Sequence, residues 1–176
     1  KGTSKVKHLL TVLSDDIGLP AIYASIAKPL VNLNVAPHYG CHALRPSNIV
    51  HFDDPLAPSI FEDLIFATGA RPVEWPRRLD CCGNPLLGKN DALSLAMMQN
   101  KIDDATESGA DCICTACTYC QIQFDSVQAN AACSEQPASM MPSILYTQLL
   151  GISMGIPERR LGVDLNKIKL EKPDDR

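Results

Sequence analysis

The sequence predicts an α/β domain, in which a small and mostly parallel β-sheet is flanked by helices. Short apolar runs alternate with stretches of helical periodicity, an alternation typical of parallel α/β folds. Three predicted strands each lead to a cysteine group, and these groups begin at Cys41, Cys81 and Cys117. With 176 residues, of which 45% are hydrophobic and 20% charged, the chain can bury a core without covalent cross-links.

The N-terminal part of the chain predicts two helices followed by a strand. Apolar residues at positions 6, 9, 10, 13 and 17 follow the spacing of an amphipathic helix, with Ser4 as its N-cap and Gly18 at its end. A second short helix is expected over residues 21–27. Residues 30–36 form a compact apolar run, which predicts a buried strand leading to the segment around Cys41.

The middle of the chain predicts a helix, a short strand and a longer helix. Residues 60–65 supply an apolar helix face that stops at Gly69. Residues 71–75, which contain one proline and precede another, predict a short strand that leads to the cysteine doublet. Asn90 is the expected N-cap of a helix over residues 92–108.

The last third of the chain predicts a strand, a helix and a mixed segment. Residues 110–114 are expected to form a strand that ends just before the last cysteine pair. In the helix that follows, one face carries Cys120, Phe124, Val127 and Ala131. Residues 142–150 should begin extended and then turn helical. We expect one domain over residues 1–157, followed by a charged C-terminal tail, 158–176, that either docks or frays.

Composition and charge narrow the class of protein. The net charge of −4 and the pI near 5.5 leave no basic stripe, so a nucleic-acid partner is not expected. No apolar run approaches the roughly 20 residues of a membrane span, and no signal peptide opens the chain, so we expect a cytoplasmic protein without a membrane span. In a reducing compartment, eight cysteines indicate metal or redox chemistry more than a disulfide framework.

Five of the cysteines form one candidate site, centred on the doublet Cys81-Cys82. Side chains of adjacent residues point in different directions, which suits a cluster with several metal corners better than one small tetrahedral ion. In a parallel sheet the groups that follow the strands would meet at the carboxyl edge. Cys117 and Cys120 would share a face in the first turn of a helix, where the helix dipole favours thiolates.

Three other interpretations of the cysteines compete with this one. Cys114, Cys117 and Cys120 match the opening of a bacterial ferredoxin motif, but position 124 is Phe where the fourth cysteine is required. A zinc site of Cys81, Cys117, Cys120 and one further cysteine remains an alternative. A thioredoxin-like dithiol at Cys117 and Cys120 would leave the doublet unexplained.

The cysteine spacing resembles that of a known family. Cys41, 39 intervening residues, Cys81-Cys82-Gly83, 33 residues and Cys117-x-x-Cys120 together resemble the CCG cysteine-rich domain of heterodisulfide reductase B subunits. Segments at 6–10, 37–42, 45–46 and 146–151 resemble the C-terminal half of that protein. Lys1 in place of an initiator methionine, with the linker-like residues after it, fits an excised half.

The resemblance implies a cofactor and a reaction. It implies a noncubane [4Fe-4S] cluster whose ligands would be Cys41, Cys81, Cys82, Cys117 and Cys120, in an oxidoreductase that passes electrons to a thiol heterodisulfide. The implied partners are a ferredoxin-like C-type subunit and a second CCG domain, because family B subunits carry two such domains. This sequence holds one copy, so we expect activity only with the missing half. The alternative is a zinc-binding structural domain for assembly, without catalysis.

The remaining candidate residues carry simpler interpretations. His38 and His42 flank Cys41, and His42 is the candidate catalytic proton donor to a leaving thiolate. The alternative for both histidines is a surface or hydrogen-bonding role. The three other cysteines are expected to pack in the interior without binding metal: Cys112, Cys114 and Cys133.

Overall fold

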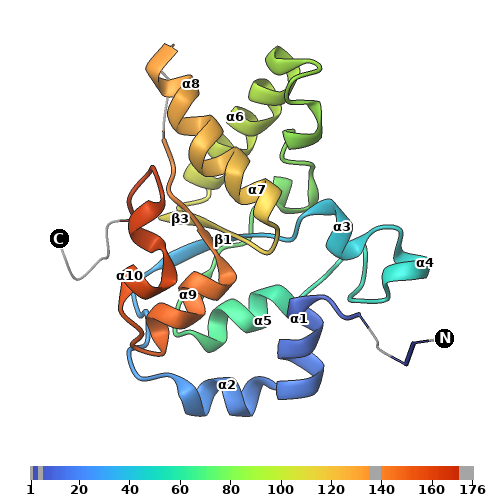
Figure 1. Cartoon of the computed structure of the whole chain (residues 1–176), viewed down its shortest axis with the longest axis vertical. Coiled ribbons are helices and arrows are strands. Elements are labelled where there is room, and N and C mark those ends of the chain that lie inside the picture. Colours follow the sequence, from blue (N-terminus) through green and yellow to red (C-terminus); the bar gives the residue numbers. More distant parts are fainter. Residues whose placement is uncertain (1, 4–5, 135–139, 171–176) are drawn as a thin grey trace.

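The computed structural model describes residues 2–3, 6–134 and 140–170, with side chains given up to residue 132 and again from residue 140 (Figure 1). At its centre lies a four-stranded sheet in the order β2-β1-β3-β4, in which every neighbouring pair is parallel. The strands are β1 (Asn34–His38), β2 (Arg71–Pro72), β3 (Cys112–Thr115) and β4 (Ser143–Leu145). The predicted α/β class is therefore confirmed.

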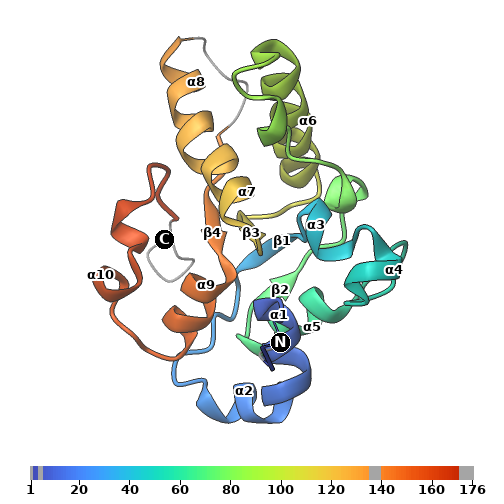
Figure 2. The same ribbon diagram turned by 45° about the vertical axis from the view of Figure 1, so that its right-hand side comes forward.

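Helices cover both faces of the sheet, giving three layers (Figures 1 and 2). One layer contains α1 (Leu9–Thr11), a π-helical segment (Val12–Ile17), α2 (Leu19–Ser25), α5 (Ile60–Ala67) and α9 (Tyr146–Ser153). The opposite layer contains α6 (Asp91–Glu107), α7 (Thr118–Ile122), a second π-helical segment (Gln123–Val127) and α8 (Gln128–Ser134). Each layer buries its own apolar cluster against the sheet, as two-sided parallel sheets require.

Aromatic rings organise the layer that contains α5. The ring of Phe61 meets Tyr39 at 5.4 Å and Tyr146 at 5.7 Å, both edge to face. The Tyr146 hydroxyl donates a hydrogen bond to the Leu64 carbonyl at 2.9 Å, which fastens α9 to α5. Phe61 is completely buried, so it links the first turn of α5 to the residue that follows β1.

The other layer is built on the helix predicted from Asn90, which is confirmed as α6. The Asn90 side chain accepts a hydrogen bond from the Leu93 amide at 3.1 Å, as an N-cap does. Met98 and Ile102 on α6 are buried together with Phe124. The methionine therefore fills the core, and α6 packs beside the α7–α8 segment.

The boundaries of three strands differ from the prediction, and β3 covers Cys112–Thr115 where residues 110–114 were expected. The apolar run 30–36 was expected to be a strand, but pairing begins only at Asn34 and continues to His38. Asn32 adopts a left-handed conformation, with φ of 73°, in a turn closed by the Leu33 amide on the Leu30 carbonyl at 3.2 Å. Residues 30–33 form this turn and are therefore not paired in the sheet. Leu33 is buried in the core, whereas Val31 is exposed.

The edge strand β2 is also shorter than the expected strand over residues 71–75. It ends at Pro72, although the Val73 amide still donates to the Val35 carbonyl at 2.8 Å. Pro37 is tolerated in the adjacent strand β1 because β2 has already ended beside it. There the Trp75 indole nitrogen donates to the Pro37 carbonyl at 2.9 Å, in place of a strand partner.

The N-terminal helix begins later than its apolar spacing predicts. Ser4, the expected N-cap, lies outside the described residues, and the cap is His8, whose Nδ1 accepts from the Leu10 amide at 3.2 Å. Of the predicted apolar face, Leu10 and Leu13 are buried. The helix ends at Gly18 as predicted, with φ of 81°.

Short helices connect the long elements near the carboxyl edge of the sheet. They are α3 (Cys41–Leu44), α4 (Ser47–Val50) and the 3-10 turns Pro76–Leu79 and Asn84–Leu86. Beyond residue 157, α10 (Glu158–Leu161) and a 3-10 turn (Val163–Leu165) fold back onto α9, and Val163 is buried. Asp125 accepts from the amides of residues 167 and 168 at 2.7 and 3.1 Å, so this segment is tied to the domain.

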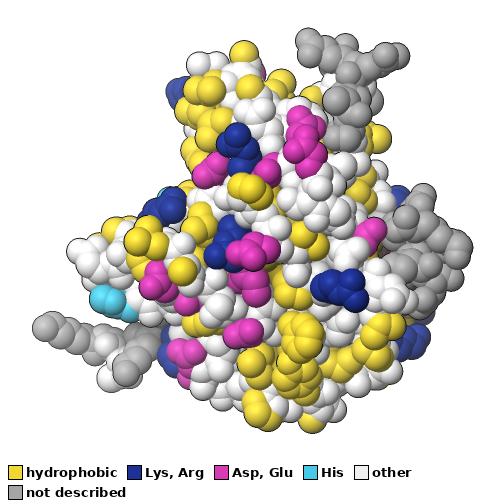
Figure 3. Space-filling model, turned by 180° about the vertical axis from the view of Figure 1, so that it is seen from behind, with side chains coloured by type: hydrophobic (Ala, Val, Ile, Leu, Met, Phe, Trp, Pro, Cys, Tyr) yellow, Lys and Arg dark blue, Asp and Glu magenta, His cyan; other side chains and the backbone are white. Residues whose placement is uncertain are grey.

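The surface carries interspersed charges. On the face seen in Figure 3, acidic and basic side chains lie next to one another between scattered hydrophobic side chains. Arg78 pairs with Glu62 at 2.9 Å, and Arg77 pairs with Asp80 at 3.3 Å. Within the described part of the chain, none of the helices combines the length and the apolar character needed to span a membrane.

Phe61→Ala should lower the free energy of unfolding by about 3–5 kcal/mol, because it removes a fully buried ring that contacts two other aromatic rings. Phe66→Ala on the same helix is the matched control, since Phe66 is 60% exposed, and it should change the stability by less than about 0.5 kcal/mol. Urea unfolding followed by circular dichroism measures both. Equal losses in the two variants would contradict the packing described.

Candidate metal centre

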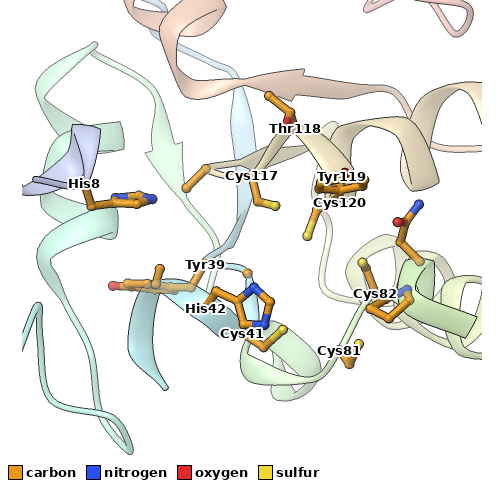
Figure 4. A pocket seen from close by; sticks show the side chains of 15 residues that line it. His8, Tyr39, Cys41, His42, Cys81, Cys82, Cys117, Thr118, Tyr119 and Cys120 are labelled. Atoms are coloured by element: carbon orange, nitrogen blue, oxygen red, sulfur yellow. The ribbon is translucent and has the colours of Figure 1, made fainter. Parts of the chain in front are cut away.

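A cavity of about 520 Å³ opens at the carboxyl edge of the sheet, and all five cysteines of the predicted site line it (Figure 4). Cys41 is the first residue of α3, directly beyond β1. Cys117 is the N-cap of α7, and Cys120 lies in its first turn. Cys81 and Cys82 lie between the two 3-10 turns. Figure 4 shows the five sulfur atoms around one space, although they come from three separate connections.

The strand order explains why the cavity lies here. From β1 the chain passes through α5 to β2 on one side, and from β3 it passes through α7 and α8 to β4 on the other side. The connections that leave β1 and β3 therefore diverge, and such a point in a parallel sheet leaves a crevice. Cys41 and Cys117 lie on these two connections, and the doublet approaches from the connection after β2.

Two glycines allow the cysteine segments to approach the neighbouring backbone. Gly40 has φ of +75°, and a Cβ there would lie 3.1 Å from the Cβ of Cys117. Gly83 has φ of +90°, and a Cβ there would lie 2.6 Å from the carbonyl oxygen of Ser94. The Ser94 hydroxyl donates to the Gly83 carbonyl at 3.0 Å, which fastens the doublet to α6. Glycine is required at both positions.

Three of the thiols are electrostatically linked. Hydrogen bonding from Cys120 lowers the pKa of Cys82 to about 4, and it also lowers the pKa of Cys117 to about 5. The pKa of Cys120 is raised in turn, by its hydrogen bonds to Cys117 and Cys82 and by burial. The proton of the Cys120 thiol is shared between these two neighbours and favours their thiolate forms. A soft metal ion would replace the shared proton, because thiolates are the metal-binding form.

Cys41 and Cys81 form the outer side of the ring of sulfur atoms. Burial raises the pKa of Cys41, and the nearby Cys81 and Cys82 raise it further. The Gly83 amide lies 3.5 Å from the Cys81 sulfur and donates a weak hydrogen bond to it. Several thiolates placed this close repel one another, so a positively charged metal centre would stabilise the arrangement.

The two predicted histidines occupy different positions. His42 is exposed and lines the cavity beside Cys41. His38 is 1% exposed and lies behind the cavity wall, where one of its ring nitrogens and the sulfur atoms of Cys82 and Cys120 are within 4.8 Å of one another. Only His42 is therefore placed to reach a molecule in the cavity.

The structure adds His8 and Tyr39 to the cavity wall, and both were missed in the sequence as site residues. The Nδ1 of His8 accepts a backbone hydrogen bond, so its neutral ring carries the proton on Nε2. The Tyr39 hydroxyl donates to the Glu62 carboxylate and accepts from the Phe61 amide at 3.1 Å. Both residues lie in segments that resemble the family, 6–10 and 37–42, but outside the cysteine motif, and the structure shows that they reach the cavity.

The other cysteines lie elsewhere. Cys112 and Cys114 are completely buried in the core cluster on the α5 side of β3. Burial raises the pKa of Cys112 to about 12 and raises that of Cys114 well above its ordinary value, as expected for neutral packing thiols. Cys133 lies within α8, and its side chain is outside the described residues. The ferredoxin-like trio is therefore divided, since Cys114 does not line the cavity.

Fold and site together define a cysteine-rich α/β domain whose thiol donors suit a soft metal centre. The family model described as a cysteine-rich domain, CCG, matches residues 35–125, which include all five cavity cysteines. The chain belongs to the CCG cysteine-rich domain family.

Curated relatives extend the likeness over nearly the whole chain. The chain is 36% identical, over 98% of its length, to the 8-methylmenaquinol:fumarate reductase membrane anchor subunit of Wolinella succinogenes. It is 34% identical, over 96% of its length, to the B subunit of the ferredoxin/F420H2-dependent CoB-CoM heterodisulfide reductase of Methanosarcina acetivorans. These alignments cover 60% and 57% of the relatives, so the chain spans little more than half of their length. Both relatives are subunits of reductases, which places the family among oxidoreductases.

A solved structure shares the fold. The crystal structure of a hypothetical protein from Helicobacter pylori matches 83% of this chain with a TM-score of 0.59, and the match covers 26% of that chain. The sequence identity is 16%, so the likeness concerns the arrangement of helices and strands.

Gly83→Ala should destabilise the protein more than Gly88→Ala, although both glycines have positive φ. Gly88 faces open space, so its substitution should cost about 1–2 kcal/mol from the left-handed backbone alone. At Gly83 the clash with Ser94 should add roughly 1–3 kcal/mol. Urea unfolding of the two variants measures the difference. Equal stabilities would show that the doublet is not held against α6 as described.

Proposed function

We propose that this chain is the iron-sulfur redox half of a heterodisulfide reductase-type B subunit. In this proposal Cys41, Cys81, Cys82, Cys117 and Cys120 bind a noncubane [4Fe-4S] cluster. The observation that carries it is the convergence of these five thiols, from three connections, on one cavity. Membership of the CCG family and the similarity to heterodisulfide reductase B subunits support the assignment.

The donor set favours a cluster over a single ion. A structural zinc site takes four ligands, whereas five thiols line this cavity, two of them from adjacent residues. A zinc-binding structural domain is the second candidate, favoured by the close grouping of His38, Cys82 and Cys120. Metal analysis separates the two.

The proposed reaction cleaves a thiol heterodisulfide with two electrons and two protons, which yields two thiols. When bound, the cluster supplies electrons one at a time. The chain's own residues admit the disulfide to the cavity and provide protons at its mouth. His42, exposed beside Cys41, is the proposed proton donor to a departing thiolate.

The proposed partners include the part of the relatives that this chain does not cover, since the alignments reach only 60% and 57% of their length. A second CCG domain would supply the other electron, and a ferredoxin-like C-type subunit would deliver electrons to both. A menaquinol donor is the alternative source, because the Wolinella relative is named for one. A reducing cytoplasm would keep the five thiols available for the metal.

Cys82→Ala should lower the iron content of anaerobically purified protein, because it removes one of the two thiolates that the Cys120 thiol stabilises. Cys114→Ala is the matched control: Cys114 is equally a buried cysteine but lies in the core, so four irons per chain should remain. Iron, sulfide and zinc analysis measures the outcome. Zinc in place of iron in the wild-type chain, or loss of iron in Cys114→Ala alone, would overturn the ligand assignment.

The isolated, iron-loaded chain should show no steady turnover of a thiol heterodisulfide with a reduced viologen until the complementary CCG domain is added.

In the assembled enzyme, His42→Gln should slow turnover by about 100-fold without changing iron content. His51→Asn is the control, because His51 is exposed and does not line the cavity. Rapid turnover by the single chain would rule out the two-domain reaction, and unchanged turnover in His42→Gln would remove His42 from it.

A further inference from the structure

His38 is a buried polar side chain without a hydrogen-bond partner. It ends β1 and is 1% exposed, yet neither ring nitrogen has a partner among the described residues. Buried polar groups are nearly always hydrogen-bonded, and an unpaired one costs stability. A histidine kept in this condition calls for a hydrogen-bond partner, and the neighbouring thiols of Cys82 and Cys120 can provide it.

The ring of His38 is directed at the thiols by its neighbours. Phe124 packs against it edge to face, with ring centroids 5.2 Å apart. On β3, Thr115 lies opposite His38 in the strand register. One ring nitrogen and the sulfur atoms of Cys82 and Cys120 lie within 4.8 Å of one another. These thiols are the only sulfur atoms grouped with His38 among the described metal-ligating side chains.

A buried lysine on α6 lies close to the thiols, since Lys101 and Cys81 line the same small cavity. Lys101 is 1% exposed, its ammonium lies 4.3 Å from the centroid of the Trp75 ring, and it donates to the Arg77 carbonyl. Burial lowers the pKa of Lys101 to about 8, while Asp80, Cys82 and other anionic groups favour the charged form. Lysine is rarely buried without partners, and here the Arg77 carbonyl, the Trp75 ring and nearby anionic groups stabilise its charge.

We propose that His38 and Lys101 are positioning residues that support the reduced state of the metal centre from inside the protein. In this proposal, which rests on the proposed function, His38 donates an N–H hydrogen bond to the thiolate of Cys82 or Cys120. Lys101 adds a positive charge on the same buried side.

The hydrogen bond from His38 and the charge of Lys101 both raise the reduction potential of the metal centre in this proposal. Reduction adds a negative charge to a centre that is already anionic, and hydrogen bonds to the sulfur atoms and nearby positive charge set its potential. In the protein interior these effects are stronger than in water, because the local dielectric constant is low. Removing either residue should therefore lower the potential. The cysteine ligands would still hold the iron.

The test compares buried changes with matched controls in the anaerobically purified chain. His38→Leu and Lys101→Met remove the donor and the charge, whereas His38→Gln keeps an N–H donor. Phe124→Leu changes the packing against His38 without altering a polar group, and Lys89→Met removes a charge from an exposed lysine. Iron content and circular dichroism are measured first, and the potential is then determined by redox titration followed by electron paramagnetic resonance.

We expect about four irons in every variant and a lower potential in His38→Leu and in Lys101→Met. The expected shift is tenfold in the one-electron equilibrium, which is about 59 mV. His38→Gln should lie closer to the wild type than His38→Leu, and both controls should match the wild type. If His38→Leu fails to fold, Lys101→Met against Lys89→Met and His38→Gln against the wild type still decide the matter.

Unchanged potentials in folded His38→Leu and Lys101→Met would overturn the inference while leaving the proposed function intact. Loss of iron from folded His38→Leu and His38→Gln would also overturn it, since His38 would then be a ligand. Absence of iron from the wild-type chain would overturn the proposed function, and this inference with it.

Discussion

The parallel pairing of β1 with β3 is the interaction on which the rest of the structure depends. Its register, from Val35 opposite Cys112 to His38 opposite Thr115, brings two carboxyl ends together at the centre of the sheet. Because the chain leaves these ends toward opposite layers, a crevice remains between them. Cys41 and Cys117 lie on its two sides, and the doublet completes the ring from a third connection.

The cavity places thiols, which need polar partners when they are ionised, beside a largely apolar core. Thiolates are costly to bury, and here they are stabilised by the Cys120 thiol and by the Gly83 amide. Behind them lie the imidazole ring of His38 and the cation of Lys101, both in the core that α6 and Phe124 complete. A change in the packing of the α6 layer would therefore also change the electrostatic surroundings of the thiols, because the same helix supports both.

The longer helices were predictable, whereas several boundaries were not. The α6 helix has an N-cap and a periodic apolar face, and both signals are local. Hydrophobicity alone could not place the start of β1, since three of the four residues 30–33 are apolar but the segment forms a turn with hydrogen bonds to distant residues. The end of β2 depended on which neighbour lay beside each proline, and local sequence does not contain that information.

The sequence by itself determined the α/β class and singled out the five cysteines that line the cavity, because strand–helix alternation and cysteine spacing are properties of the chain order. Only the tertiary structure decided which other polar residues face these thiols. Periodicity shows that a residue such as His38 or Lys101 lies on a given face of its element, but not what lies opposite. That neighbour depends on how the layers pack across the sheet, and these contacts join residues far apart in the chain.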